Sequence, residues 1–184
     1  KIGVPTLFGT GAEATRTCVL KNTETGAKLG MNSDYSYFDG LAIDPNLCLS
    51  ADFKQFFYTA MDTYIHCIES LAGSYRSPLG DYYSKLALEL IEEIFSSSSP
   101  RSEENLEKLA FASYFGGTAI GFSKVGLIHP FSAGLSMAFD MPHCLANCVA
   151  FLGLTDYYPK EYEVFKSYVK KFDIAFQLPD FDFQ

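Results

Sequence analysis

Four side chains from two distant segments of the sequence are of the types that bind divalent metal ions. Asp62 and His66 are four residues apart in a predicted helix, and side chains at this spacing share one face, with Cβ atoms about 5–6 Å apart. His129 and His143 are the only other histidines. Three imidazoles and one carboxylate suit iron(II), zinc or manganese. We therefore predict a metal site of Asp62, His66, His129 and His143. The alternative is a buried polar pair on one helix and two histidines satisfied at helix ends.

The two late histidines can share one ion only if the chain reverses between them. In a straight helix, His129 and His143 would be roughly 21 Å apart, whereas metal–nitrogen bonds are about 2.0–2.1 Å long. Gly134 lies midway, and Pro142, directly before His143, disfavours a continuing helix. The sequence thus predicts two short helices joined by a tight reversal.

Helices should position these side chains, because apolar residues recur every three or four positions from Ser50 onward. Ser50 is a suitable N-cap for the first helix and Gly73 a suitable stop, and Ser102 is a suitable cap for the third. Gly116 and Gly117 lower helix propensity, so we expect close packing there. The expected later helices are Asp81–Phe95, Ser102–Phe122, one opening at His129–Pro130, one from Pro142–His143 to Leu154, and Lys160–Phe172, followed by a frayed tail, Gln177–Gln184.

The first 45 residues lack this helical period. Thr15 to Leu20 favours a strand, Asn22 to Gly26 a turn, and Ala27 to Gly30 a returning strand. Leu41 to Asp44, stopped by Pro45, is consistent with a last strand. We therefore expect a β-hairpin and a short strand ahead of an all-helical domain.

Composition excludes several classes of protein. The 184 residues carry a net charge of −8 with scattered basic residues, which argues against binding nucleic acid or an anionic membrane. No run of about 18 apolar residues occurs, so we expect no membrane span, and no signal peptide opens the chain. An odd number of cysteines without a C-x-x-C pair favours reduced thiols in a cytoplasmic protein; the five are Cys18, Cys48, Cys67, Cys144 and Cys148.

These motifs together resemble one family, the iron-containing (group III) alcohol dehydrogenases. The resemblance rests on the predicted ligands, on Pro142-His143-x-x-Ala146-Asn147, on the loop Pro5–Thr15, which is similar to the family's P-T-T-x-G-T loop, and on Asp44-Pro45-Asn46-Leu47. Tyr64–Ser70 and Pro130–Ser136 look most like the 3-deoxy-octulosonate 8-oxidase branch, which oxidises a sugar-acid alcohol to an aldehyde.

The resemblance implies a mainly α fold. Residues 46–184 would form an all-helical, metal-binding catalytic domain. Residues 1–45 would be a β-hairpin remnant, the C-terminal portion of a Rossmann-like α/β nucleotide-binding domain. The family's glycine-rich pyrophosphate loop would lie upstream, and the chain begins in what looks like mid-domain, so the fragment alone should be incomplete as an enzyme.

The implied activity is hydride transfer between an alcohol and NAD or NADP. The metal, Fe²⁺ by resemblance with Zn²⁺ or Mn²⁺ as alternatives, would act as a Lewis acid on the alcohol oxygen, and the enzyme would be a homo-oligomer. The residues implied at the cofactor are Thr6, Leu7, Thr15, Lys28 and Leu47. Their alternatives are hairpin surface for Thr6, Thr15 and Lys28, and ordinary core for Leu47.

Two departures from the family pattern affect the expected chemistry. Ala133 stands where the family often has a further histidine, so a proton relay through that residue is not available, and Leu7 replaces a threonine hydroxyl. Two other functions stay open. One is a dehydroquinate-synthase-like, metal-dependent lyase or synthase, although that class usually has glutamate in place of Asp62. The other is an inactive truncated fragment with a structural metal site.

Overall fold

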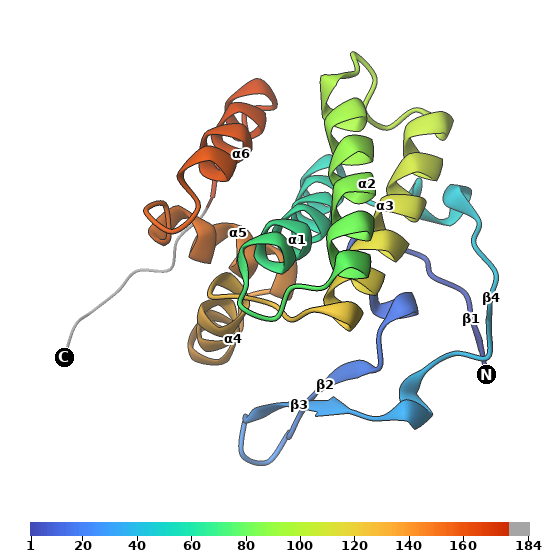
Figure 1. Cartoon of the computed structure of the whole chain (residues 1–184), viewed down its shortest axis with the longest axis vertical. Coiled ribbons are helices and arrows are strands. Elements are labelled where there is room, and N and C mark those ends of the chain that lie inside the picture. Colours follow the sequence, from blue (N-terminus) through green and yellow to red (C-terminus); the bar gives the residue numbers. More distant parts are fainter. Residues whose placement is uncertain (177–184) are drawn as a thin grey trace.

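Helix α1 (Phe53–Ala72) lies at the centre of the helical domain in the computed structural model, which describes residues 1–176 (Figure 1). It packs against α2, α3 and α5, and α2 and α3 pair along their length. The expectation of a frayed tail at residues 177–184 lies outside the described residues. The mainly α fold is confirmed, and the other helices are α2 (Pro78–Ser96), α3 (Glu103–Phe122), α4 (Ile128–Phe139), α5 (His143–Gly153) and α6 (Pro159–Lys171).

The central helix begins two residues later than the sequence suggested. Asp52, not Ser50, is the N-cap, because its side chain accepts a hydrogen bond from the amide of Gln55 at 2.8 Å and so satisfies a free amide of the first turn. Every residue from Thr59 to Ser70 is buried, as expected of a helix with neighbours on all sides. Polar side chains on this helix are therefore removed from water.

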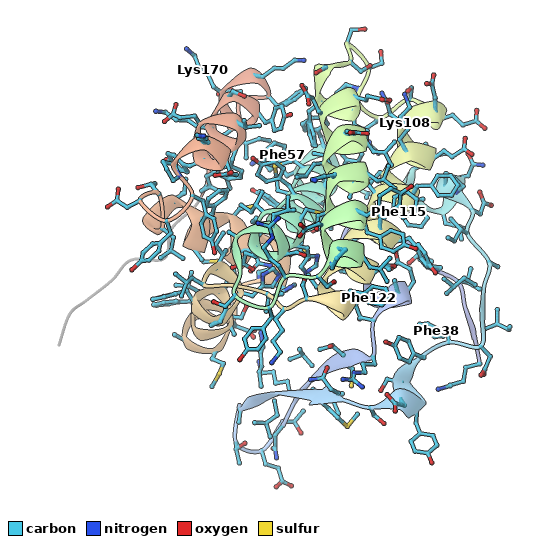
Figure 2. All side chains as sticks on the ribbon, in the orientation of Figure 1. Phe38, Phe57, Lys108, Phe115, Phe122 and Lys170 are labelled. Carbon is cyan, nitrogen blue, oxygen red and sulfur yellow. The ribbon has the colours of Figure 1, made fainter. Side chains whose placement is uncertain are left out.

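Helices α2 and α3 each begin directly after a serine that caps the helix. Ser77 caps α2, because its side chain accepts a hydrogen bond from the amide of Gly80. The helix therefore begins at Pro78, three residues before the expected start. Proline is common at this first helical position. Ser102 caps α3 as predicted. Figure 2 shows Phe57 inside the helical layer, and Lys108 and Lys170 on its outer surface. The core that holds α1 is rich in rings, including Phe56, Phe57, Phe95, Phe151 and Phe165, all at most 2% exposed.

The expected close approach at the two glycines of α3 is confirmed. A Cβ on Gly117 would lie 2.4 Å from the carbonyl oxygen of Gly11, and one on Gly116 would lie 2.9 Å from Cγ2 of Thr63. The loop of residues 5–15 therefore rests directly on α3. Gly11 itself has a φ of +63°, in the left-handed region that glycine adopts without cost.

Two small sheets precede the helices. Strands β2 (Thr17–Lys21) and β3 (Lys28–Asn32) form the predicted antiparallel hairpin, which projects beyond the helices in Figure 1. Strands β1 (Ile2–Gly3) and β4 (Gly40–Leu41) pair in parallel. The predicted last strand is thus shorter than expected and lies earlier, because Asp44 caps a 3₁₀ helix at Pro45–Cys48.

Among the described residues, no single helix has the length and apolar character needed to cross a membrane. The bent pair α4–α5 meets that test when its two helices are taken together, on length and composition alone.

Candidate metal centre

The reversal that brings the late histidines together lies at the end of α4. Helix α4 continues through Gly134, so this glycine is not the helix break that the sequence suggested. No neighbouring atom lies within 4 Å of its Cβ position, so no close contact requires a glycine there. The chain turns at Asp140, which has a φ of +50°, and α5 starts at His143 behind Pro142, as predicted. The two helices are bent by 118° relative to each other, and this bend places His129 and His143 near one point.

Three of the four predicted ligands meet around that point. The Nε2 atom of His129 lies 3.4 Å from Oδ1 of Asp62, and Nε2 of His143 lies 3.6 Å from Oδ2 of Asp62. One donor atom from each residue falls within 4.8 Å of the other two. The predicted convergence of the two segments is therefore present, and metal binding by these donors stays a prediction.

His66, the fourth predicted ligand, borders this group without belonging to it. Its Nε2 atom lies 3.9 Å from Oδ1 of Asp62, and its ring is stacked on that of His129 with centroids 4.6 Å apart. The three-residue set of mutually close donors does not include it. His66 thus lies beside the cluster, one helical turn from Asp62 on the same face of α1.

Asn147, which the sequence analysis noted only as part of a family motif and not as a site residue, lies at the centre of the cluster. Its Nδ2 atom is 2.5 Å from Oδ1 of Asp62 and 3.2 Å from the Nε2 atoms of both His129 and His143. Asn147 follows His143 by one helical turn on α5, so the spacing could have placed it on the same face. The side-chain amide thus contacts the carboxylate oxygen of Asp62 and the ring nitrogens of both late histidines, and it links these histidines to α1.

Glu69 was also missed, although it lies one further turn along α1 from His66. Its side chain is fully buried, and its Oε2 atom is 2.5 Å from Nδ1 of His129, while its Oε1 atom accepts a hydrogen bond from the amide of Ile128. The i, i+4, i+7 spacing of Asp62, His66 and Glu69 is the signal that could have found it.

The environment sets the protonation of the cluster. Burial would raise the pKa of Asp62, but the three histidines around it lower that pKa well below its usual range. Burial lowers the pKa of His66 to about 4 and lowers that of His143 as well. For His129, burial is outweighed by hydrogen bonds to Asp62 and Glu69, which raise its pKa to about 9. Asp62 is therefore ionised, and His66 is a neutral imidazole at neutral pH.

The donor chemistry fits a divalent cation. Asp62 and Glu69 are both fully buried, and within residues 1–176 neither pairs with a lysine or arginine. A buried carboxylate is costly unless a positive charge and hydrogen bonds compensate it. Nδ1 of His66 and Oδ1 of Asn147 are buried and have no hydrogen-bond partner in the described part of the chain. The cluster thus places two buried carboxyl groups beside three histidines, the donor types that bind a divalent cation, and leaves two buried polar atoms unpaired.

The predicted cofactor residues lie on three segments: the loop of residues 5–15, the hairpin, and, for Leu47, the 3₁₀ helix Pro45–Cys48. Lys28 reaches α4, where its Nζ donates to the carbonyl oxygen of Ser136 at 3.2 Å. Thr15 is buried and Leu47 is 40% exposed, so the alternatives of hairpin surface for Thr15 and ordinary core for Leu47 are wrong. Thr6 is exposed, and Leu7 packs partly buried against the core. Their contact with a cofactor stays a prediction.

Comparison with known proteins agrees with this fold. The family model "Fe-containing alcohol dehydrogenase family, C-terminal" matches residues 56–175. The sulfoacetaldehyde reductase of Bilophila wadsworthia is 28% identical over 78% of the chain and 38% of its own length. The 1,3-propanediol dehydrogenase of Klebsiella pneumoniae is 31% identical over 80% of the chain and 39% of its own length.

A solved structure has a similar fold. A 1,3-propanediol oxidoreductase crystal structure superposes with a TM-score of 0.81 at 25% identity, covering 95% of this chain and 53% of that one. The chain thus spans about half or less of the length of the proteins that it matches.

Fold and site define a helical domain in which a central helix and a bent helix pair bring together a carboxylate and histidines, the side-chain types that bind divalent metals. The family match covers well over half of the chain. The chain belongs to the iron-containing alcohol dehydrogenase family, of which it represents the C-terminal, helical part.

Proposed function

We propose that the chain is the metal-binding part of a metal-dependent oxidoreductase that transfers hydride between an alcohol and NAD or NADP. The observation that carries the proposal is the fully buried carboxylate of Asp62, whose only ion-pair partners among the described residues are three histidines. Family membership adds the reaction class, because two relatives are named as a reductase and a dehydrogenase of small aldehyde or alcohol substrates.

The proposed ligands are Asp62, His66, His129 and His143, with iron(II) favoured by the family name. A bound divalent ion supplies Lewis-acid polarisation of the alcohol or aldehyde oxygen. The neutral imidazole of His66 leaves a lone pair free for ligation. The ionised carboxylate of Asp62 would lower the net charge of a divalent centre. The three imidazoles, with His129 giving up a proton on metal binding, would leave the remainder positive. That remainder favours a substrate oxygen carrying negative charge.

The open side of the cluster is the side of His143. Its side chain is 51% exposed, whereas those of His129 and Asp62 are 10% and 0% exposed. Substrate would therefore approach past His143, between the bent helix pair and the hairpin. Lys28 lies on this side and places a positive charge where the phosphate or ribose of a nicotinamide cofactor could be bound.

We assign the cofactor side to Thr6, Leu7, Thr15, Lys28 and Leu47, all on residues 1–47. Residues 1–45 would belong to a nucleotide-binding domain and residues 46–184 to the helical catalytic domain. The parallel pairing of β1 with β4 supports this division, since parallel strands are typical of α/β domains. Ala133 carries no titratable group, so the proton of the alcohol leaves by a route that does not use that position.

Within this reaction class we favour a primary alcohol of a sugar acid as substrate. The support is the resemblance of Tyr64–Ser70 and Pro130–Ser136 to the branch that oxidises such alcohols. The five free cysteines support a reducing, cytoplasmic location.

The decisive test is elemental analysis of the purified protein against its His129→Ala variant after loading with Fe²⁺ or Zn²⁺. We expect one ion per chain in the wild type and a large loss in the variant. Cys67→Ala is the matched control, because Cys67 is equally buried on α1 but faces α3, 3.7 Å from a Cβ built on Gly116. Equal metal content in the wild type and the His129→Ala variant would contradict the site.

A second measurement separates the oxidoreductase from a structural metal site. Full-length protein containing this chain should form NADH or NADPH when supplied with NAD or NADP and a sugar-acid alcohol, and chelation should abolish that activity. Metal binding without any alcohol-dependent reduction of NAD or NADP would favour a purely structural metal.

A further inference from the structure

We propose that Glu69 is a positioning residue of this metal centre, which fixes His129 as a ligand with Nδ1 protonated and Nε2 free. The inference rests on the metal site of the proposed function and concerns a residue outside the predicted ligand set. Glu69 lies on α1 seven residues after Asp62 and contacts none of the reacting groups.

Both oxygens of Glu69 are used within one turn of α4. Oε2 lies 2.5 Å from Nδ1 of His129, and Oε1 accepts the hydrogen bond of the Ile128 amide. The side chain is fully buried, so water does not compete for either bond. One carboxylate on α1 therefore holds two consecutive residues of α4.

The bond to Nδ1 determines which nitrogen of His129 can bind a metal. Glu69 receives the Ile128 amide on one oxygen and contacts Nδ1 with the other; with the carboxyl oxygen as acceptor, Nδ1 carries the hydrogen. When a metal displaces the remaining ring proton, the lone pair is on Nε2, the atom that lies 3.4 Å from Asp62 and belongs to the three-donor cluster. A carboxylate behind a histidine ligand also makes the ring a better donor, and losing such a partner typically costs 10–100-fold in metal affinity.

The bond to Ile128 fixes the position of the helix that carries His129. Leu127 at the N-cap of α4 provides no side-chain acceptor, although the first amides of a helix need one. Glu69 takes that role from a different helix, and its negative charge suits the positive end of the helix dipole. Gly126 permits the approach, because a Cβ there would lie 3.1 Å from Oε1 of Glu69. Orientation of the ligand and placement of α4 thus depend on one side chain.

The test measures Co²⁺ binding by the visible spectrum of the full chain, together with the imidazole ¹⁵N shifts of the Zn²⁺-loaded protein. In the Glu69→Gln variant the side chain keeps one oxygen acceptor, and an NH₂ group replaces the other oxygen. The NH₂ group cannot accept a hydrogen bond, so either Nδ1–H of His129 or the Ile128 amide loses its own acceptor oxygen. We expect Co²⁺ affinity to fall by about 10–100-fold and His129 to lose its uniform Nδ1–H state.

Glu13→Gln is the matched control, because Glu13 is also a buried glutamate but its carboxylate accepts from Ser113 on α3. We expect its Co²⁺ affinity to stay within about twofold of the wild type. A Glu69→Gln variant with wild-type affinity and the wild-type His129 tautomer would overturn the inference, as would equal losses in both variants. If His129→Ala also leaves binding unchanged, the proposed function fails as well; if it abolishes binding, only the role of Glu69 is refuted.

Discussion

The contact between α3 and the loop of residues 5–15 gives a sharp prediction about Gly117. A Cβ at this position would lie 2.4, 2.8 and 3.0 Å from the carbonyl oxygen, Cα and carbonyl carbon of Gly11. All three are backbone atoms, so no side-chain rotation can relieve the clash. Gly117→Ala must therefore push the loop off the helix or bend the helix.

The expected magnitude follows from two opposing effects. Overpacking of this kind typically costs about 1–3 kcal/mol, and the rigidity of the contacted atoms places this case at the upper end. Replacing glycine by alanine inside a helix gains about 1 kcal/mol. We therefore expect Gly117→Ala to lower the free energy of unfolding by about 1–2 kcal/mol, equivalent to a fall in Tm of roughly 2–8 °C for a chain of this size.

Gly121 provides the control within the same helix. It is exposed, has no neighbour within 4 Å of its Cβ position, and does not have a positive φ. Gly121→Ala should gain about 0.5–1 kcal/mol from helix propensity alone. Urea unfolding monitored by circular dichroism measures both variants. The reasoning is refuted if Gly117→Ala proves as stable as Gly121→Ala, because the close backbone approach would then carry no cost.

Two further predictions concern a buried carboxyl and a buried ring. Burial raises the pKa of Glu13 above its ordinary value of 4.5, although hydrogen bonds from its own backbone and from Ser113 oppose the shift. Its carboxyl therefore favours folding below pH 4.5, and this contribution is lost as the pH rises through the folded-state pKa. The difference in Tm between the wild type and the Glu13→Gln variant should accordingly fall as the pH rises from 4 to 7. A difference that stays constant over this range would contradict the reasoning. Phe95 is fully buried against Phe57 and Tyr168, with ring centroids 5.6 and 5.0 Å away. Phe95→Ala should cost about 3–5 kcal/mol in urea unfolding, whereas Phe111→Ala, at 49% exposure, should cost far less, and similar losses would argue against this core.

Local chemistry explains why the helices could be predicted from the sequence. The apolar period and serine caps are properties of neighbouring residues, and Ser102 caps α3 where expected. The start of α1 was misplaced because Ser50 and Asp52 are both good caps by type. Only the extended backbone at Asp52, with its bond to Gln55, distinguishes them.

Residue types and spacing were enough to name the candidate metal ligands and to predict that two segments converge, because Asp62 and His66 share a helix face and the chain contains only three histidines. The position of the reversal could be read only from the folded chain, since Asp140 takes a left-handed conformation that its sequence context did not demand. The folded chain also shows that Glu69 and Asn147 join the cluster. Their partners lie 60 and 85 residues away along the chain, and packing rather than local spacing brings such distant groups into contact.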